Sequence, residues 1–144
     1  MLTKKDEIVT ITNISIEAFN SDSLVGLDPN DGPPGYNSLK WHQEMQSQKH
    51  LYSYIDDSGE IIGGAILFCS PTEVYVGRIF ISPKYHRKGY GIKLMNDIEN
   101  MFSNVKTFKL DTPEKNIRTN NFYTKLGYKK CGFDGYCVVY MKQL

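Results

Sequence analysis

The chain has 144 residues, of which 40% are hydrophobic and 23% are charged, and its formal net charge is only +1. These values exclude extensive disorder and suffice for one domain with its own core, which we expect to span residues 1–144. No apolar run is long enough for a bilayer and no signal-peptide core follows Met1. We therefore expect a cytoplasmic protein without a membrane partner.

The charges are unevenly distributed along the chain. Residues 1–83 hold five basic and eleven acidic side chains, whereas residues 84–130 hold eleven basic and four acidic ones. This split fits an anionic ligand at one region and a cationic ligand at another, and charges that only solvate two faces are an equal alternative. A pI near 7.7 and aromatic residues without a stacking pattern argue against a nucleic-acid partner.

The cysteines and histidines give no sign of a metal site or a disulfide framework. Cys69, Cys131 and Cys137 form an odd set without a CxxC pair, and the three histidines are scattered. Because all three cysteines lie in segments typical of strands, we expect them to be small buried hydrophobic residues.

The first third of the chain predicts two helices around a loop. Residues 5–19 have apolar side chains at mixed spacing, and we favour a helix there. The loop at 27–37 holds three prolines and two glycines. A second helix follows from Asn37 or Ser38 to about Gln48, and its expected inner face consists of Leu39, Trp41, His42 and Met45.

Three antiparallel strands are expected next. Residues 50–55 and 60–68 are typical of a hairpin around the turn at 56–59, and the glycine pair at 63–64 indicates a bulge or a close backbone approach. Residues 73–81 are rich in β-branched and aromatic side chains and form the third strand, which ends before Pro83.

A glycine turn and a helix follow this strand. The turn, residues 84–91, has two glycines one residue apart and several basic side chains. Glycine lets a ligand approach the backbone, and the free N–H groups of a first helical turn bind phosphates, so the turn favours an anion; a solvated basic turn is the alternative. The helix has an apolar face made of Leu94, Met95, Ile98, Met101 and Phe102, with Glu99 among the polar residues between them.

The last third predicts a strand at 105–110, a helix that begins at Thr112 or Asn116 and ends at Gly127, and a closing hairpin of 128–131 with 136–141. The fold class is therefore α+β. We expect a mixed, mostly antiparallel sheet with helices on both faces. A strand before the first helix would be absent or very short, because few residues precede that helix.

Two motifs resemble the GCN5-related N-acetyltransferase (GNAT) superfamily. Residues 81–91, ISPKYHRKGYG, are similar to its acetyl-CoA signature, a strand end, Pro, and Arg/Gln-x-x-Gly-x-Gly/Ala. The sequence departs from that signature at His86, which stands at the Arg/Gln position. Residues 116–128, NIRTNNFYTKLGY, are similar to the second motif, in which Asn is followed seven residues later by Tyr. Together with the elements around them, the motifs cover about residues 60–130.

The resemblance implies a six- to seven-stranded acyl-CoA N-acyltransferase fold and acetyl-CoA as co-substrate, without a metal. It also implies that the acceptor site borders the loop between the first two helices, where Asp28, Asp31 and Tyr36 are candidates for binding an ammonium group. A solvated connector is the alternative for that loop. The residues expected to bind acetyl-CoA are Phe80, Ile81, His86, Arg87, Lys88, Gly89, Tyr90, Gly91, Ile92, Asn116 and Tyr123.

Acetyl transfer from a thioester to an amine needs an acid, an oxyanion donor and a base. A phenol with the ordinary pKa of about 10 is protonated at neutral pH, so Tyr123 suits the acid, with core packing as its alternative role. The resemblance implies that a backbone amide near Ile81 stabilises the oxyanion. Glu73 and Asp111 are candidates for the base, and for each of them a solvated carboxylate at a strand end is the favoured alternative.

Three functions compete at this stage. The first is an acetyl-CoA-dependent N-acetyltransferase that acts on a small molecule or a protein, with a cationic amine as the expected acceptor. The second is a non-catalytic acyl-CoA-binding sensor, against which Tyr123 argues. The third is a dinucleotide-binding domain. Two features argue against it: Leu94 stands where the GxGxxG motif has its third glycine, and the strands before the turn form hairpins instead of βαβ units. A homodimer is an open alternative to a monomer.

Overall fold

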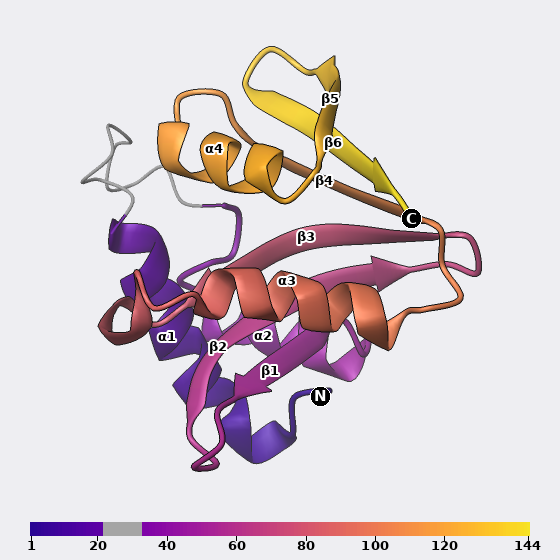
Figure 1. Ribbon diagram of the computed structural model, residues 1–144. Helices are drawn as coiled ribbons and strands as arrows, with labels where there is room; N and C mark the ends of the chain where they lie inside the picture. The colour runs from indigo at the N-terminus through magenta and orange to yellow at the C-terminus, as the bar shows by residue number, and fades with distance from the viewer. Residues whose placement is uncertain (22–32) are drawn as a thin grey trace.

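The computed structural model describes residues 1–21 and 33–144, and these form one mixed sheet with helices on both faces (Figure 1). The strand order is β1-β2-β3-β4-β6-β5, in which only β3 and β4 pair in parallel. The α+β fold expected from the sequence is confirmed. The strands are β1 (Leu51–Ile55), β2 (Ile61–Cys69), β3 (Glu73–Ile81), β4 (Thr107–Pro113), β5 (Lys129–Phe133) and β6 (Cys137–Gln143).

Two helices cover each face of the sheet. In Figure 1, α3 crosses in front of the strands and α1 and α2 lie behind them. Side chains of α3 and α4 share a core with β3, β4 and β6, while α1 packs on β1 and β2 from the other face. Within residues 1–21 and 33–144, no helix combines the length and apolar composition needed to cross a bilayer. The helices are α1 (Ile8–Asn20), α2 (Leu39–Ser47), α3 (Tyr90–Met101) and α4 (Ile117–Lys125), with short 3-10 helices η1 (Lys5–Glu7) and η3 (Pro83–Tyr85).

The first strand of the expected fold is reduced to one bridge. Leu2 pairs with Tyr52 beside the edge strand β1. The Thr3 amide donates to the Leu51 carbonyl at 2.9 Å, and the Thr3 side chain bonds to the Ser53 hydroxyl at 2.8 Å. The chain then turns into η1 and α1, so the expectation of an absent or very short first strand is confirmed.

Strands β3 and β4 run together and then part, which opens the sheet at its centre. Their parallel pairing begins with Glu73 opposite Thr107 and ends with Val76 opposite Leu110. The register of β2 against β3 also shifts at this point, between Ile66 and Leu67. Such bulges re-aim a strand. The last five residues of β3, 77–81, therefore keep β2 on one edge, and no strand within residues 1–21 and 33–144 pairs with the other edge.

The glycine pair in β2 lies against the end of β3. A Cβ on Gly63 would lie 2.4 Å from the Phe80 carbonyl oxygen, and one on Gly64 would lie 2.8 Å from the Phe80 ring. Larger side chains at these positions would push β3 out of place. The close backbone approach expected from the sequence is thus confirmed.

Helix α3 packs against the sheet mostly as its sequence pattern predicts. Leu94, Met95 and Ile98 are buried. Two expectations are wrong. Met101 is 48% exposed, because the helix ends there, and Glu99 is buried among the apolar residues. Buried carboxylates need partners, and Glu99 accepts hydrogen bonds from the Tyr128 hydroxyl at 3.1 Å and from the Lys142 ammonium at 2.9 Å.

Two further expectations are corrected by the structure, and the choice between Thr112 and Asn116 as the start of the last helix is settled in favour of Asn116. Leu39 is exposed, since it begins α2 on the solvent side. Cys69 and Cys131 are exposed and Cys137 is half-buried, because they lie at strand ends and on the edge strand β5 instead of in the core. The last helix begins after Asn116, because Thr112 and Pro113 extend β4.

Candidate active site

A cleft of about 680 Å³ lies where β3 and β4 part. Its walls come from the end of β3, the glycine turn, the start of α3, helix α4 and the end of α1. It brings together segments that are far apart in the sequence, and it includes every residue predicted to bind acetyl-CoA except Lys88 and Asn116. The lining residues are Ala18, Phe19, Ser21, Ile79, Phe80, Ile81, Pro83, Tyr85, His86, Arg87, Gly89, Tyr90, Gly91, Ile92, Arg118, Thr119, Phe122 and Tyr123.

The glycine turn presents the backbone of α3 to this cleft. Gly89 caps the helix with φ +80°, a left-handed conformation that favours glycine. The Lys93 amide bonds to the Gly89 carbonyl at 3.1 Å, so the amides before Lys93 precede the helical hydrogen-bond pattern. These N–H groups and the positive end of the helix dipole suit a phosphate.

His86 fixes the turn to the strand. Its Nε2 lies 2.8 Å from the Ile81 carbonyl oxygen, and because a carbonyl only accepts, Nε2 is the protonated nitrogen. The residue that departs from the family signature therefore ties the end of β3 to the turn. Its side chain positions the loop, and the backbone amides remain available to an anion.

The positive charges of the cleft suit a ligand with several phosphates. Arg87 from the turn and Arg118 from α4 both line it. Lys88 does not, and its ammonium lies 5.8 Å from the centre of the Tyr85 ring. Glycines, helical amides and two guanidinium groups around a cleft of this volume fit the pyrophosphate of coenzyme A.

Tyr123 enters the cleft from α4, and its ring is otherwise buried. The side chain is 6% exposed and packs among other aromatic rings, with ring centres 5.2 Å from Phe122 and 6.0 Å from Tyr128. Phe122 in turn approaches the first turn of α3, because a Cβ on Gly91 would lie 3.2 Å from its ring. The glycine turn and the predicted acid are thus held together by packing.

Several predicted residues have other places in the structure. Asn116 is buried and caps α4, since its side chain accepts from the Thr119 amide at 3.1 Å. Tyr36 is buried, and its ring lies edge-on to Phe19 at 6.0 Å between ring centres. Asp28 and Asp31 lie outside the described residues. The roles proposed for these four residues in binding remain predictions.

The two candidate bases lie at different ends of the β3–β4 pair. Glu73 begins β3 and forms an ion pair with Lys109 at 3.1 Å. At 3.3 Å per residue it is roughly 26 Å from Ile81, which lines the cleft, so its position does not support a role as the base. Asp111 lies just past the point of parting and accepts a hydrogen bond from the Tyr75 hydroxyl.

Sequence reasoning missed the part of the cleft that comes from α1. Ala18, Phe19 and Ser21 line it, and the Phe19 ring lies 6.0 Å from the Phe80 ring. No motif marks these residues, since only the folding of α1 onto the sheet brings them to the turn. Arg118 and Thr119 could have been predicted from the sequence, because they lie within the second motif.

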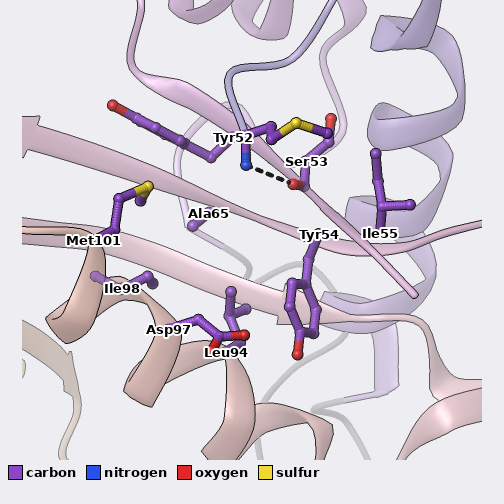
Figure 2. Close-up of a pocket in the computed structure, with 10 residues that line it drawn as sticks. Tyr52, Ser53, Tyr54, Ile55, Ala65, Leu94, Asp97, Ile98 and Met101 are labelled. Carbon is purple, nitrogen blue, oxygen red and sulfur yellow. Dashed lines mark hydrogen bonds between the residues drawn. The ribbon is translucent and has the colours of Figure 1, made fainter. Parts of the chain in front are cut away.

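A second, smaller cavity of about 190 Å³ lies between β1 and the C-terminal half of α3 (Figure 2). Tyr54 and Asp97 point toward one another there. Burial, followed by the charge and hydrogen bond of Asp97, raises the pKa of Tyr54 to about 12. The walls of this smaller cavity are mainly apolar, and none of its lining residues also lines the cleft at the parted strands.

Comparisons with known proteins agree on one family. The sequence profile described as Acetyltransferase (GNAT) domain matches residues 47–130, which is more than half of the chain. No curated protein sequence matches the chain.

Solved structures share the whole fold at low sequence identity. A GNAT-family acetyltransferase from Streptococcus agalactiae 2603 has a TM-score of 0.86 at 22% identity, over 100% of this chain and 94% of that one. The PaiA N-acetyltransferase from Thermoplasma acidophilum in complex with coenzyme A has a TM-score of 0.81 at 18% identity, over 100% and 97%. The ribosomal-protein-S18-alanine N-acetyltransferase from Escherichia coli has a TM-score of 0.76 at 15% identity, over 99% and 91%.

Proposed function

Because this chain belongs to the GNAT acetyltransferase family, we propose that it transfers an acetyl group from acetyl-CoA to a primary amine by direct attack on the thioester. The observation that carries the proposal is the cleft at the parted strands, which joins the glycine turn of α3 to Tyr123 of α4. The turn suited to a phosphate and the residue proposed as proton donor thus face one space.

Acetyl-CoA would be held by elements that the structure provides. The amides that open α3 and the Arg87 side chain would bind the pyrophosphate. The edge of β3 that has left β4, from residue 77 to Ile81, would offer N–H and C=O groups to the pantetheine amides and an N–H to the thioester carbonyl. The coenzyme A bound in the structurally similar Thermoplasma acidophilum protein supports this part of the proposal.

Besides the β3 N–H for the thioester carbonyl, the reaction needs proton transfers from this chain. The neutral amine attacks the carbonyl carbon, a C–N bond forms and the C–S bond breaks. Tyr123 gives its hydroxyl proton to the leaving sulfur, and the new amide nitrogen loses one proton. Asp111 is the remaining candidate to accept that proton, either directly or through water, because it lies beside the parted strands.

The acceptor is proposed to be an amine of a small molecule or a protein. The similar Escherichia coli structure is named as an N-acetyltransferase of a ribosomal protein alanine, which supports an amine acceptor. The acidic first part of the chain supports an acceptor that carries a positive charge in solution.

Two measurements test the proposal. Calorimetric titration with acetyl-CoA should show micromolar binding, with no heat from NAD as the control ligand. Thiol release should then appear with at least one member of an amine panel. Binding without thiol release would favour the acyl-CoA sensor instead, and no binding of acetyl-CoA would refute both.

A further inference from the structure

Arg78 is a half-buried cation next to the cleft. It lies two residues before Phe80 on β3, so both side chains point to the face covered by α1 and α2, roughly 7 Å apart. Its guanidinium lies 4.3 Å from the centre of the Trp41 ring, and its Nη2 donates to the Pro34 carbonyl at 2.8 Å. Gly35 permits this arrangement, because a Cβ there would lie 2.4 Å from the Trp41 ring.

Most hydrogen-bond donors of this guanidinium have no acceptor. Its Nε and Nη1 are buried and have no hydrogen-bond partner within the described parts of the chain. These two atoms carry three of the five N–H groups of an arginine. A desolvated cation with unused donors is costly, and proteins normally pair such groups. The arrangement therefore holds a guanidinium ready for an acceptor that the described residues do not supply.

The surroundings of Arg78 place it beside the reacting end of the strands. Asp111 lies on the adjoining strand just past the point of parting, close enough for its charge to act on Arg78. Burial lowers the pKa of Arg78 to about 10, and the Asp111 carboxylate opposes that shift. The guanidinium is therefore charged at neutral pH, with a carboxylate nearby that the Tyr75 hydroxyl already holds.

We propose that Arg78 binds a carboxylate of the acceptor, so that the acceptor is an amino acid or a similar molecule with a carboxylate close to its amine. This inference rests on the proposed acetyl transfer and narrows its substrate class. A carboxylate accepts charge-assisted hydrogen bonds from the unused N–H groups. The amine of the same molecule then lies on the side of Asp111 and the parted strands.

A zwitterionic acceptor agrees with both charges of this region. An amine without a carboxylate would leave the three N–H groups of Arg78 unpaired when it binds. A simple anion would gain nothing from Asp111. A molecule that carries both groups satisfies Arg78 with its carboxylate and keeps its ammonium near Asp111 until that ammonium loses its proton.

The test separates binding from turnover. The common amino acids, each paired with its carboxamide, are titrated into the protein saturated with coenzyme A, in which no acetyl transfer occurs. At least one acid should bind roughly tenfold or more tightly than its carboxamide, as expected for charge-assisted hydrogen bonds. Arg78→Met should abolish this preference and Arg78→Lys should retain part of it.

Lys109→Met is the matched control, because it removes a positive charge from the neighbouring strand β4 and leaves Arg78 in place. It should keep the full preference. Equal binding of every acid and its carboxamide to the wild-type protein would overturn the inference, even if Arg78→Met failed to fold. Thiol release with amines that lack a carboxylate, together with that equality, would leave the proposed acetyl transfer intact.

Discussion

The two ends of the β3–β4 pair differ in how many hydrogen-bond partners their charged side chains have. At the paired end, the carboxylate of Glu99 has the Lys142 ammonium and the Tyr128 hydroxyl as partners. At the parted end, Arg78 has one hydrogen-bond acceptor and an aromatic ring among the residues that the structure describes. Satisfied buried charges fix a unique packing, whereas unsatisfied ones reduce stability and are expected where a ligand binds. The contrast separates a structural end from a functional end.

The largest effect should come from the parted end. Tyr123→Phe removes the proton donor for the leaving sulfur and should lower kcat about 100-fold or more, with nearly unchanged affinity for acetyl-CoA. Steady-state thiol release and calorimetric titration measure the two quantities. Tyr128→Phe is the matched control, since this buried tyrosine lies 6.0 Å from Tyr123 between ring centres but bonds to Glu99. Wild-type kcat in Tyr123→Phe would remove Tyr123 from the mechanism.

A substitution at the paired end should change the stability of the protein. Lys142→Met leaves the Glu99 carboxylate buried with only the Tyr128 hydroxyl and should lower the free energy of unfolding by roughly 2–3 kcal/mol. Urea titration followed by circular dichroism measures this change, and kcat at low temperature should be unaffected.

The double variant Glu99→Gln with Lys142→Met sharpens the assignment. Because it removes the unpaired charge, it should recover part of the lost stability. If the double variant is as unstable as Lys142→Met alone, lost packing of the lysine stem explains the effect instead.

His42 should give a smaller, pH-dependent effect. It is fully buried on α2, and desolvation by burial, followed by the nearby Arg78 charge, lowers its pKa below 6.5 against an opposing hydrogen bond to the Ser38 carbonyl. The unfolded chain therefore binds the proton first, and stability should fall by up to about 1.4 kcal/mol per pH unit as the pH drops below 6.5. His42→Leu should lose this slope in urea titrations at pH 7 and pH 5.5; an identical slope would exclude His42 as its source.

The smallest effect on stability is expected for Arg78→Met. The change removes a hydrogen bond and a cation–π contact, but it also removes the cost of a desolvated cation with unused donors, so the free energy of unfolding should change by less than about 1 kcal/mol. Thermal unfolding of Arg78→Met and of Lys142→Met, measured under the same conditions, compares the two losses of stability. A loss as large as that of Lys142→Met would show that Arg78 is a structural cation, and the contrast between the two ends would fail.

The sequence predicts the elements of this fold well where local signals are strong. The two glycines of the turn, the strand before it and the spacing from Asn116 to Tyr123 identify the cleft, because each motif forms one of its walls. Local signals fail where a distant partner decides the outcome. Glu99 is polar by composition, and only the side chains of Tyr128 and Lys142, folded over it, allow its burial.

The same limit applies to the candidate site. Arg78 has no motif around it, and its role emerges only when Trp41 and Pro34 are seen to hold it. Glu73 was one of two candidate bases because it begins the strand that leads to the cleft, but the length of that strand separates its two ends. Gly77 is the extra residue of β3 between Val76 and Arg78, so it decides to which face of the sheet the later side chains of β3 point. Bulges leave little trace in a sequence.

The most direct test of the account is a map of backbone amide shifts on titration of isotope-labelled protein with acetyl-CoA. The account predicts the largest shifts from Ile79 to Ile92 and at Tyr123, with little change from Glu73 to Val76 or along β1 beside the smaller cavity. Large shifts at β1 and the C-terminal half of α3, with none in the glycine turn, would contradict it.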